Sequence, residues 1–173
     1  MVAQKSIKGL SGEIIQIGAV RVGDEYQVLD TFDIAIKPVH YRKMNKYVAN
    51  LTQITNADLA KGVPVKEAME KFRAWCGEDF CFCTWGPDDI RVLRDNLIHF
   101  GLDDSWLPET YDLQWMFDDF EKDEGKQWAL SYAMYYFDEK PDGMHTALAD
   151  AVSTVAVLKH LDPGVELYEF AIY

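Results

Sequence analysis

The sequence contains few of the features that mark membrane or secreted proteins. No apolar run among its 173 residues approaches the length of about 20 residues that a membrane-spanning helix needs. The N-terminal segment has no apolar signal-peptide core. Cysteine is scarce, since only Cys76, Cys81 and Cys83 are present, and their spacing is not that of a zinc site. We therefore expect a cytoplasmic protein without a membrane partner, whose cysteines are reduced thiols packed in the core.

Basic residues are also in short supply. The chain has 17 Lys and Arg against 29 Asp and Glu, a net charge of −12. This balance excludes a protein that coats long nucleic acids, because such binding depends on neutralising phosphates. The stretch Lys37–Lys46 is an exception, with four basic residues and no acid. It is either a substrate-binding loop that contacts phosphates through Arg42, Lys43 and Lys46, or an ordinary solvated loop.

The remaining composition predicts one α/β domain over residues 1–173. Hydrophobic residues make up 49% of the chain and aromatic residues 13%, and there is neither an internal repeat nor a low-complexity linker. Runs rich in β-branched or aromatic residues predict strands, and amphipathic spacing between Gly and Pro signals predicts helices. The predicted strands are Glu13–Val22, Tyr26–Ile36 and Phe80–Trp85; the predicted helices are Val65–Cys76, the segment from Asp88 to Gly101, Gln127–Phe137 and the segment from Ala147 towards Leu161.

Two candidate site residues lie at the start of the last predicted helix. His145 and Asp150 are five residues apart, so on one helix their side chains would diverge by about 140°. They converge only if His145 lies on the entering loop or the first turn. A His that accepts a proton beside a carboxylate that binds a hard cation is then one interpretation, and ordinary surface polarity is the other.

A second acidic pair follows the short strand Phe80–Trp85. Gly86-Pro87 ends that strand, and Asp88-Asp89 opens the next helix. We expect Asp88 to be the helix N-cap. Asp89 is the better candidate for chemistry, because α/β sheets place ligands beyond the carboxyl ends of their strands.

Three blocks in order, EIIQIGAV, TWGPDD and HTALADA, resemble the DEDDh family of 3′–5′ exonucleases. This ribonuclease H-like group includes ribonuclease T and polymerase proofreading subunits. The W-G-x-x-D form of the middle block and the LTQIT stretch most resemble the histone-mRNA exonuclease branch and its bacterial relatives. The resemblance extends from Glu13 to about Leu161, and His-x-Ala-x-x-Asp-Ala is its most specific block. It implies an α/β ribonuclease H-like exonuclease fold with a mixed central sheet flanked by helices.

The resemblance also implies a function. In this family, two Mg²⁺ or Mn²⁺ ions assist hydrolysis of phosphodiester bonds at the 3′ ends of single-stranded RNA, DNA or short oligonucleotides. If the roles of the family's second and third motifs are transferred to the matching positions, Asp89 and Asp150 would be metal ligands and His145 would be the general base.

One family motif is absent. An Asp-x-Glu strand should precede EIIQIGAV, yet residues 1–12 contain no acid, and we do not expect Glu13 to replace it. The chain is then an exonuclease whose central first strand precedes Met1, or a catalytically silent module that binds nucleic acid or a protein. An unrelated α/β interaction domain is the third alternative. We expect the first: a chain without its central strand, with about half of a metal site, one bound ion or none, and no nuclease activity by itself.

Overall fold

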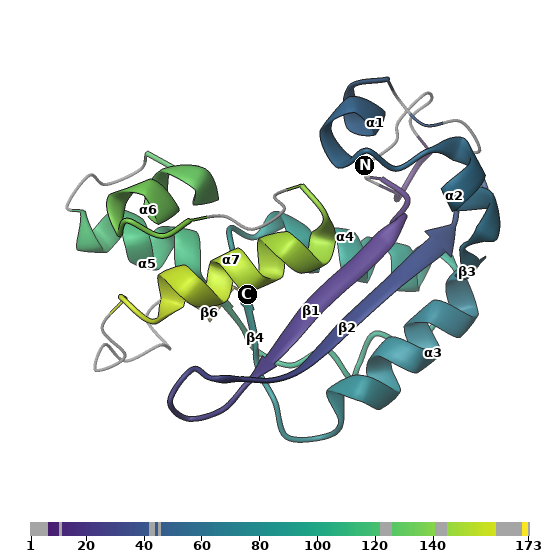
Figure 1. Ribbon diagram of the computed structural model, residues 1–173. Coiled ribbons are helices and arrows are strands. Elements are labelled where there is room, and N and C mark those ends of the chain that lie inside the picture. The colour runs from purple at the N-terminus through teal and green to yellow at the C-terminus, as the bar shows by residue number, and fades with distance from the viewer. Residues whose placement is uncertain are drawn as a thin grey trace.

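The computed structural model describes residues 7–10, 12–41, 44, 46–121, 126–140, 145–161 and 171–172 (Figure 1). Arg42 and Lys43, two of the three predicted phosphate contacts, lie outside the described residues. In the described part of the chain, no helix combines the length and apolarity required to cross a bilayer.

A three-stranded sheet forms the first half of the fold. Strand β1 (Gln16–Val22) pairs antiparallel with β2 (Val28–Lys37), whose end pairs parallel with the short β3 (Val63–Pro64). The predicted hairpin is confirmed, although β1 begins three residues later than expected. The reason is that Glu13 folds its carboxylate back onto the backbone N–H groups that follow β2.

A second three-stranded sheet lies opposite the first. Strand β4 (Phe82–Thr84) pairs parallel with β5 (Thr110–Asp112), and β5 pairs antiparallel with β6 (Ala171–Ile172). Both β1 and β4 are edge strands of their sheets. Within the described ranges no strand lies between them. Ile7 makes only an isolated bridge to Leu10.

The helices follow the predicted order. Helix α3 (Val65–Cys76) has the predicted bounds, set by Pro64 and Gly77. The helix predicted from Gln127 begins only at Leu130. Two helices before α3 were not predicted, and a reciprocal capping box between Thr55 and Asp58 starts the second of them. The other helices are α1 (Lys46–Thr52), α2 (Asn56–Lys61), α4 (Asp88–His99), α5 (Leu113–Phe120), α6 (Leu130–Tyr136) and α7 (Ala147–Leu158).

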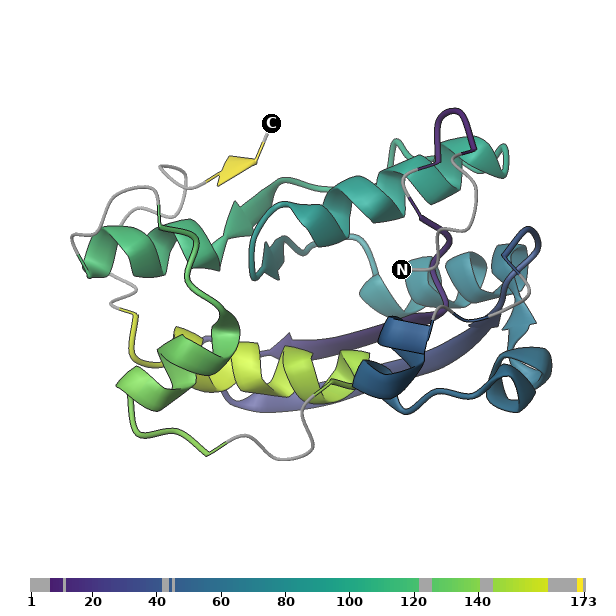
Figure 2. The same ribbon diagram turned by 90° about the horizontal axis from the view of Figure 1, so that it is seen from above.

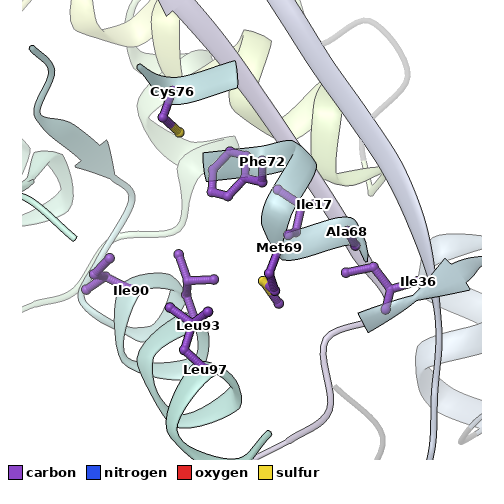
Figure 3. Close-up of a cluster of buried hydrophobic side chains, with 9 residues drawn as sticks. All are labelled: Ile17, Ile36, Ala68, Met69, Phe72, Cys76, Ile90, Leu93 and Leu97. Atoms are coloured by element: carbon purple, nitrogen blue, oxygen red, sulfur yellow. The ribbon is translucent and has the colours of Figure 1, made fainter. Parts of the chain in front are cut away.

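The elements form two layers. Figure 2 shows β1, β2 and α7 on one side of the molecule and β4 and α4 on the other. One hydrophobic cluster joins α3 and α4 to the first sheet, and Figure 3 shows its side chains. A second cluster joins α5, α6 and α7. The two layers therefore share side-chain packing, while their sheets remain separate.

Candidate active site

Helix α7 is positioned by a direct contact with the backbone of β1. A Cβ atom at Gly18 would lie 2.1 Å from the backbone nitrogen of Leu148 and 2.2 Å from the carbonyl carbon of Ala147. Only glycine admits so close an approach. The Gln16 side chain adds a hydrogen bond, because its Oε1 accepts from the Ala147 N–H at 3.3 Å. Gly18 and Gln16 thus fix the first turn of α7 against β1.

His145 lies on the loop before α7, as its spacing from Asp150 requires. Its φ of 79° is unusual for a residue with a side chain, and Thr146 is the N-cap of the helix, accepting from the Ala149 N–H. The His145 backbone N–H donates to Asp150 Oδ1 at 3.1 Å. The loop thus bends back over the first turn, so His145 and Asp150 are close together.

Asp89 lies in the first turn of α4, just beyond β4. The turn between them depends on Gly86, whose φ is 84° and whose N–H donates to Asp112 Oδ1 at 3.1 Å. The prediction that Asp88 caps α4 is wrong. Pro87 occupies the N-cap position, and the Asp88 carboxylate instead accepts from Arg91 Nη2 at 2.6 Å.

The carboxylates of Asp89 and Asp150 influence one another. The pKa of Asp89 is raised above its ordinary value, first because surrounding protein displaces water, and then because Asp88 and Asp150 add negative charge. Its side chain still reaches solvent through the cleft that Asp88, Asp89, His145 and Asp150 line together. Among the described residues, no N–H or O–H group donates a hydrogen bond to the Asp89 carboxylate. Its charge is therefore unneutralised by protein groups.

This arrangement fits one hard cation better than two. Mg²⁺ in phosphate-transfer sites is commonly held by one or two carboxylates, together with waters and substrate phosphates, and Asp89 and Asp150 can supply those carboxylates. Among the described residues, no three or more His, Cys, Asp and Glu side chains are placed together to hold a metal ion. The donors that the structure brings together therefore do not fit a two-metal site.

Two further acids, Glu13 and Asp112, have structural partners. Glu13 is buried, and its carboxylate accepts from the backbone N–H groups of Val39, His40 and Tyr41. Asp112 caps α5 through the N–H groups of Gln114 and Trp115. Such bonds occupy acceptor positions that a cation would need; that Glu13 is no substitute ligand stays a prediction.

One other sequence-based expectation, on the cysteines, changes, while the phosphate contact of Lys46 stays a prediction. Lys46 is the exposed first residue of α1 and does not line the cleft. Cys76 is buried, but Cys81 is exposed, so the prediction that all three cysteines pack in the core is wrong for Cys81. Sequence reasoning missed the positioning roles of Gln16 and Gly18. The available signal was a glycine inside a strand of β-branched residues, which marks a close backbone approach.

Comparison with known proteins identifies the family. The exonuclease family model matches residues 7–158. The chain belongs to the exonuclease family. Over 158 residues, this exonuclease-family chain is 25% identical to a probable 3′-5′ exonuclease, KapD of Bacillus subtilis (strain 168), covering 91% of this chain and 77% of KapD.

Solved structures confirm the ribonuclease H-like exonuclease fold. The nuclease domain of 3'hExo, a DEDDh family member bound to rAMP, has a TM-score of 0.82 at 18% identity, with 95% of this chain and 88% of that chain covered. A full-length 3'-exonuclease has a TM-score of 0.81 at 18% identity, with 90% of this chain covered. The exonuclease-family chain spans 55% of the length of that full-length protein.

Proposed function

We propose that this member of the exonuclease family is a metal-dependent 3′–5′ exonuclease for single-stranded RNA or DNA ends and short oligonucleotides. The observation that carries the proposal is the convergence of Asp89, Asp150 and His145 on one cleft. Each comes from the motif that the family resemblance assigns to catalysis. Residues 1–173 form one domain in this proposal, with a cytoplasmic location.

The three residues have distinct roles. Asp89 and Asp150 bind a divalent cation, which supplies a positive charge for the phosphate oxygens of the substrate. His145 takes the proton of the attacking water, because an imidazole nitrogen can accept a proton as a general base. The bond from its backbone N–H to Asp150 keeps the base beside the ligand.

The same geometry limits what the chain does alone. At this end of the cleft, within the described ranges, Asp88 is paired with Arg91 and Glu13 and Asp112 accept from several backbone N–H groups, whereas Asp89 accepts no hydrogen bond and Asp150 accepts one, from the His145 N–H. Two Mg²⁺ or Mn²⁺ ions need more ligands than these. We propose that the 173-residue chain binds one ion and a nucleic-acid 3′ end, and that turnover requires further carboxylates.

Binding of end-labelled oligonucleotides tests this proposal. With Mn²⁺ present, the purified chain should bind a linear single-stranded oligonucleotide without degrading it. Linear DNA should compete, whereas circular single-stranded DNA, which has no ends, should compete poorly. Asp150→Asn should remove the Mn²⁺ dependence of binding, and Glu109→Gln, an exposed acid outside the cleft lining, should not. Robust digestion by the chain alone would overturn the claim that the metal site is incomplete.

The alternative is a catalytically silent module of the same fold, which the small set of carboxylates placed beside His145 in the described part of the chain favours. Such a module would bind oligonucleotide equally well with EDTA and with Mn²⁺, and Asp150→Asn would leave its affinity unchanged. The same titrations therefore separate the two functions.

The basic loop is proposed to bind phosphates of the nucleic-acid strand. Replacing Arg42, Lys43 and Lys46 with Ala should weaken binding and reduce the slope of log K against log salt by up to about 0.7 for each phosphate that the loop no longer neutralises. Lys66→Ala, at an exposed position of α3, is the control. An unchanged salt slope would make the loop an ordinary surface segment.

A further inference from the structure

Two histidine side chains meet outside the cleft. His40 follows β2, and His99 is the last residue of α4. Their Nε2 atoms lie 2.9 Å apart, and the planes of the two rings meet at 77°. Neither histidine is among the residues that line the cleft of Asp89 and Asp150. The pair is therefore separate from the candidate active site, and it joins segments from the two layers of the fold (Figure 2).

One buried polar network holds the backbone beneath both rings. The Asn96 side chain is fully buried and bonds to the backbone on either side of Glu13, donating at 2.7 Å and accepting at 3.2 Å. Glu13 is also buried, and its carboxylate accepts from the His40 backbone N–H at 3.0 Å. Asn96 lies on α4 one turn before His99. The short segment 12–14 thus fixes the positions of both histidines.

An aromatic side chain restricts the two rings as well. The Phe100 ring stacks on the His40 ring at 5.9 Å between centroids, and it meets the His99 ring edge-on at 5.0 Å. His40 is exposed and His99 is half-buried, so ions in solution can reach the pair. His99 also lies at the C-terminal end of α4, where the helix dipole favours positive charge. A cation at this point would meet two nitrogens that the fold has already placed.

The distance between the two nitrogens matches a particular class of metal ion. Imidazole nitrogens bind transition metals at about 2.0–2.1 Å, so two nitrogens at right angles on one ion lie about 2.9 Å apart, and two at a tetrahedral angle about 3.3 Å apart. Ni²⁺ and Cu²⁺ prefer tetragonal geometry, in which neighbouring ligands are at right angles. The observed separation of 2.9 Å is that of two neighbouring ligands on such an ion.

We propose that His40 and His99 form a binding site for one transition-metal dication of the Ni²⁺ and Cu²⁺ class. Both Nε2 atoms are ligands, and the ring that donates the present hydrogen bond then carries its proton on Nδ1. Among the described residues, no third His, Cys, Asp or Glu side chain is placed with them, so water completes the coordination. The ion ties the segment after β2 to the end of α4.

Titration of the full 173-residue chain with Ni²⁺ tests the site. Ni²⁺ is the probe because, unlike Cu²⁺, it does not oxidise the exposed Cys81 thiol. Substoichiometric Ni²⁺ should first shift or broaden the amide signals of residues 38–41 and 97–101. His40→Ala should weaken Ni²⁺ affinity at least about tenfold in calorimetry, because two linked ligands bind more tightly than one. The control is His160→Ala, which removes a histidine paired with Glu139 and should leave the affinity unchanged.

A second variant, His99→Gln, separates the metal site from the hydrogen bond. A glutamine amide can still hydrogen-bond to His40, but its nitrogen has no lone pair to offer an ion. The variant should keep the Tm of the metal-free wild type and lose Ni²⁺ affinity. Ni²⁺ at about 100 times its Kd should raise the wild-type Tm by about 5–10 °C and should leave the Tm of His99→Gln unchanged.

Three outcomes would overturn the proposal. Equal Ni²⁺ affinity of the wild type, His40→Ala and His99→Gln would make the pair a hydrogen bond only. Signals that change first around residues 81–83 would place the ion at the thiols. Loss of Ni²⁺ binding in Asp150→Asn would place it at the candidate active site. We expect Asp150→Asn to bind Ni²⁺ like the wild type, so that failure of the proposed Mn²⁺ site and failure of the two-histidine site are distinguishable.

Discussion

Substitution of Gly18 by Ala probes the contact that places α7. The added Cβ would lie 2.1 Å from the Leu148 nitrogen, whereas ordinary contact begins at 3.4 Å. Helix and strand must therefore separate by about 1.3 Å along that line, and the obstructing atoms are backbone atoms that no rotamer change can move. Overpacking of this kind costs about 1–3 kcal/mol or somewhat more, and we expect about 3 kcal/mol here.

Thermal and urea unfolding measure the effect. For a domain of this size, about 3 kcal/mol corresponds to a fall in Tm of about 6–12 °C. The control is Gly23→Ala, where the added Cβ meets only the end of the Gln27 side chain, which can rotate away. Because α7 carries Asp150, Gly18→Ala should also weaken Mn²⁺ binding. Equal stability of the two variants would refute the close contact between α7 and β1.

Three further substitutions test the site. The pKa of Asp89 is raised above 3.8 in the folded protein, so ionising its carboxylate opposes folding. This loss of stability appears as the pH rises through and above 3.8. Asp89→Asn should therefore raise the Tm at pH 7 without divalent ions, but not below pH 3.8. Glu13→Gln should cost about 2 kcal/mol in urea unfolding, through weaker bonds from backbone N–H groups, while exposed Glu109→Gln should not. In a form of the enzyme that also holds the further carboxylates which turnover requires, His145→Ala should lower kcat by about 10²–10⁴ with little change in Mn²⁺ affinity; equal losses of both would make His145 a ligand.

Local signals in the sequence predicted much of the fold. The bounds of α3 follow from Pro64 and Gly77, because each restricts the backbone locally. The location of His145 before α7 follows from helical geometry once His145 and Asp150 are taken to share one site. The family motifs add the ribonuclease H-like arrangement, which the solved structures confirm.

Contacts between distant parts of the chain explain what the sequence did not reveal. The Gly18–Leu148 approach joins residues far apart in the sequence, and neither residue signals its partner. The late start of β1 depends on Glu13 binding backbone beyond β2. Asp88 is a good N-cap by residue type, but Arg91 one turn later engages its carboxylate instead.

Paramagnetic broadening by Mn²⁺ tests the central claim most directly, that Asp89 and Asp150 form one cation site beside His145. With substoichiometric Mn²⁺, amide signals of residues 86–90 and 145–151 should broaden first. Asp150→Asn should abolish this selectivity. Uniform broadening over the acidic surface of this chain of net charge −12, unchanged by Asp150→Asn, would contradict the account.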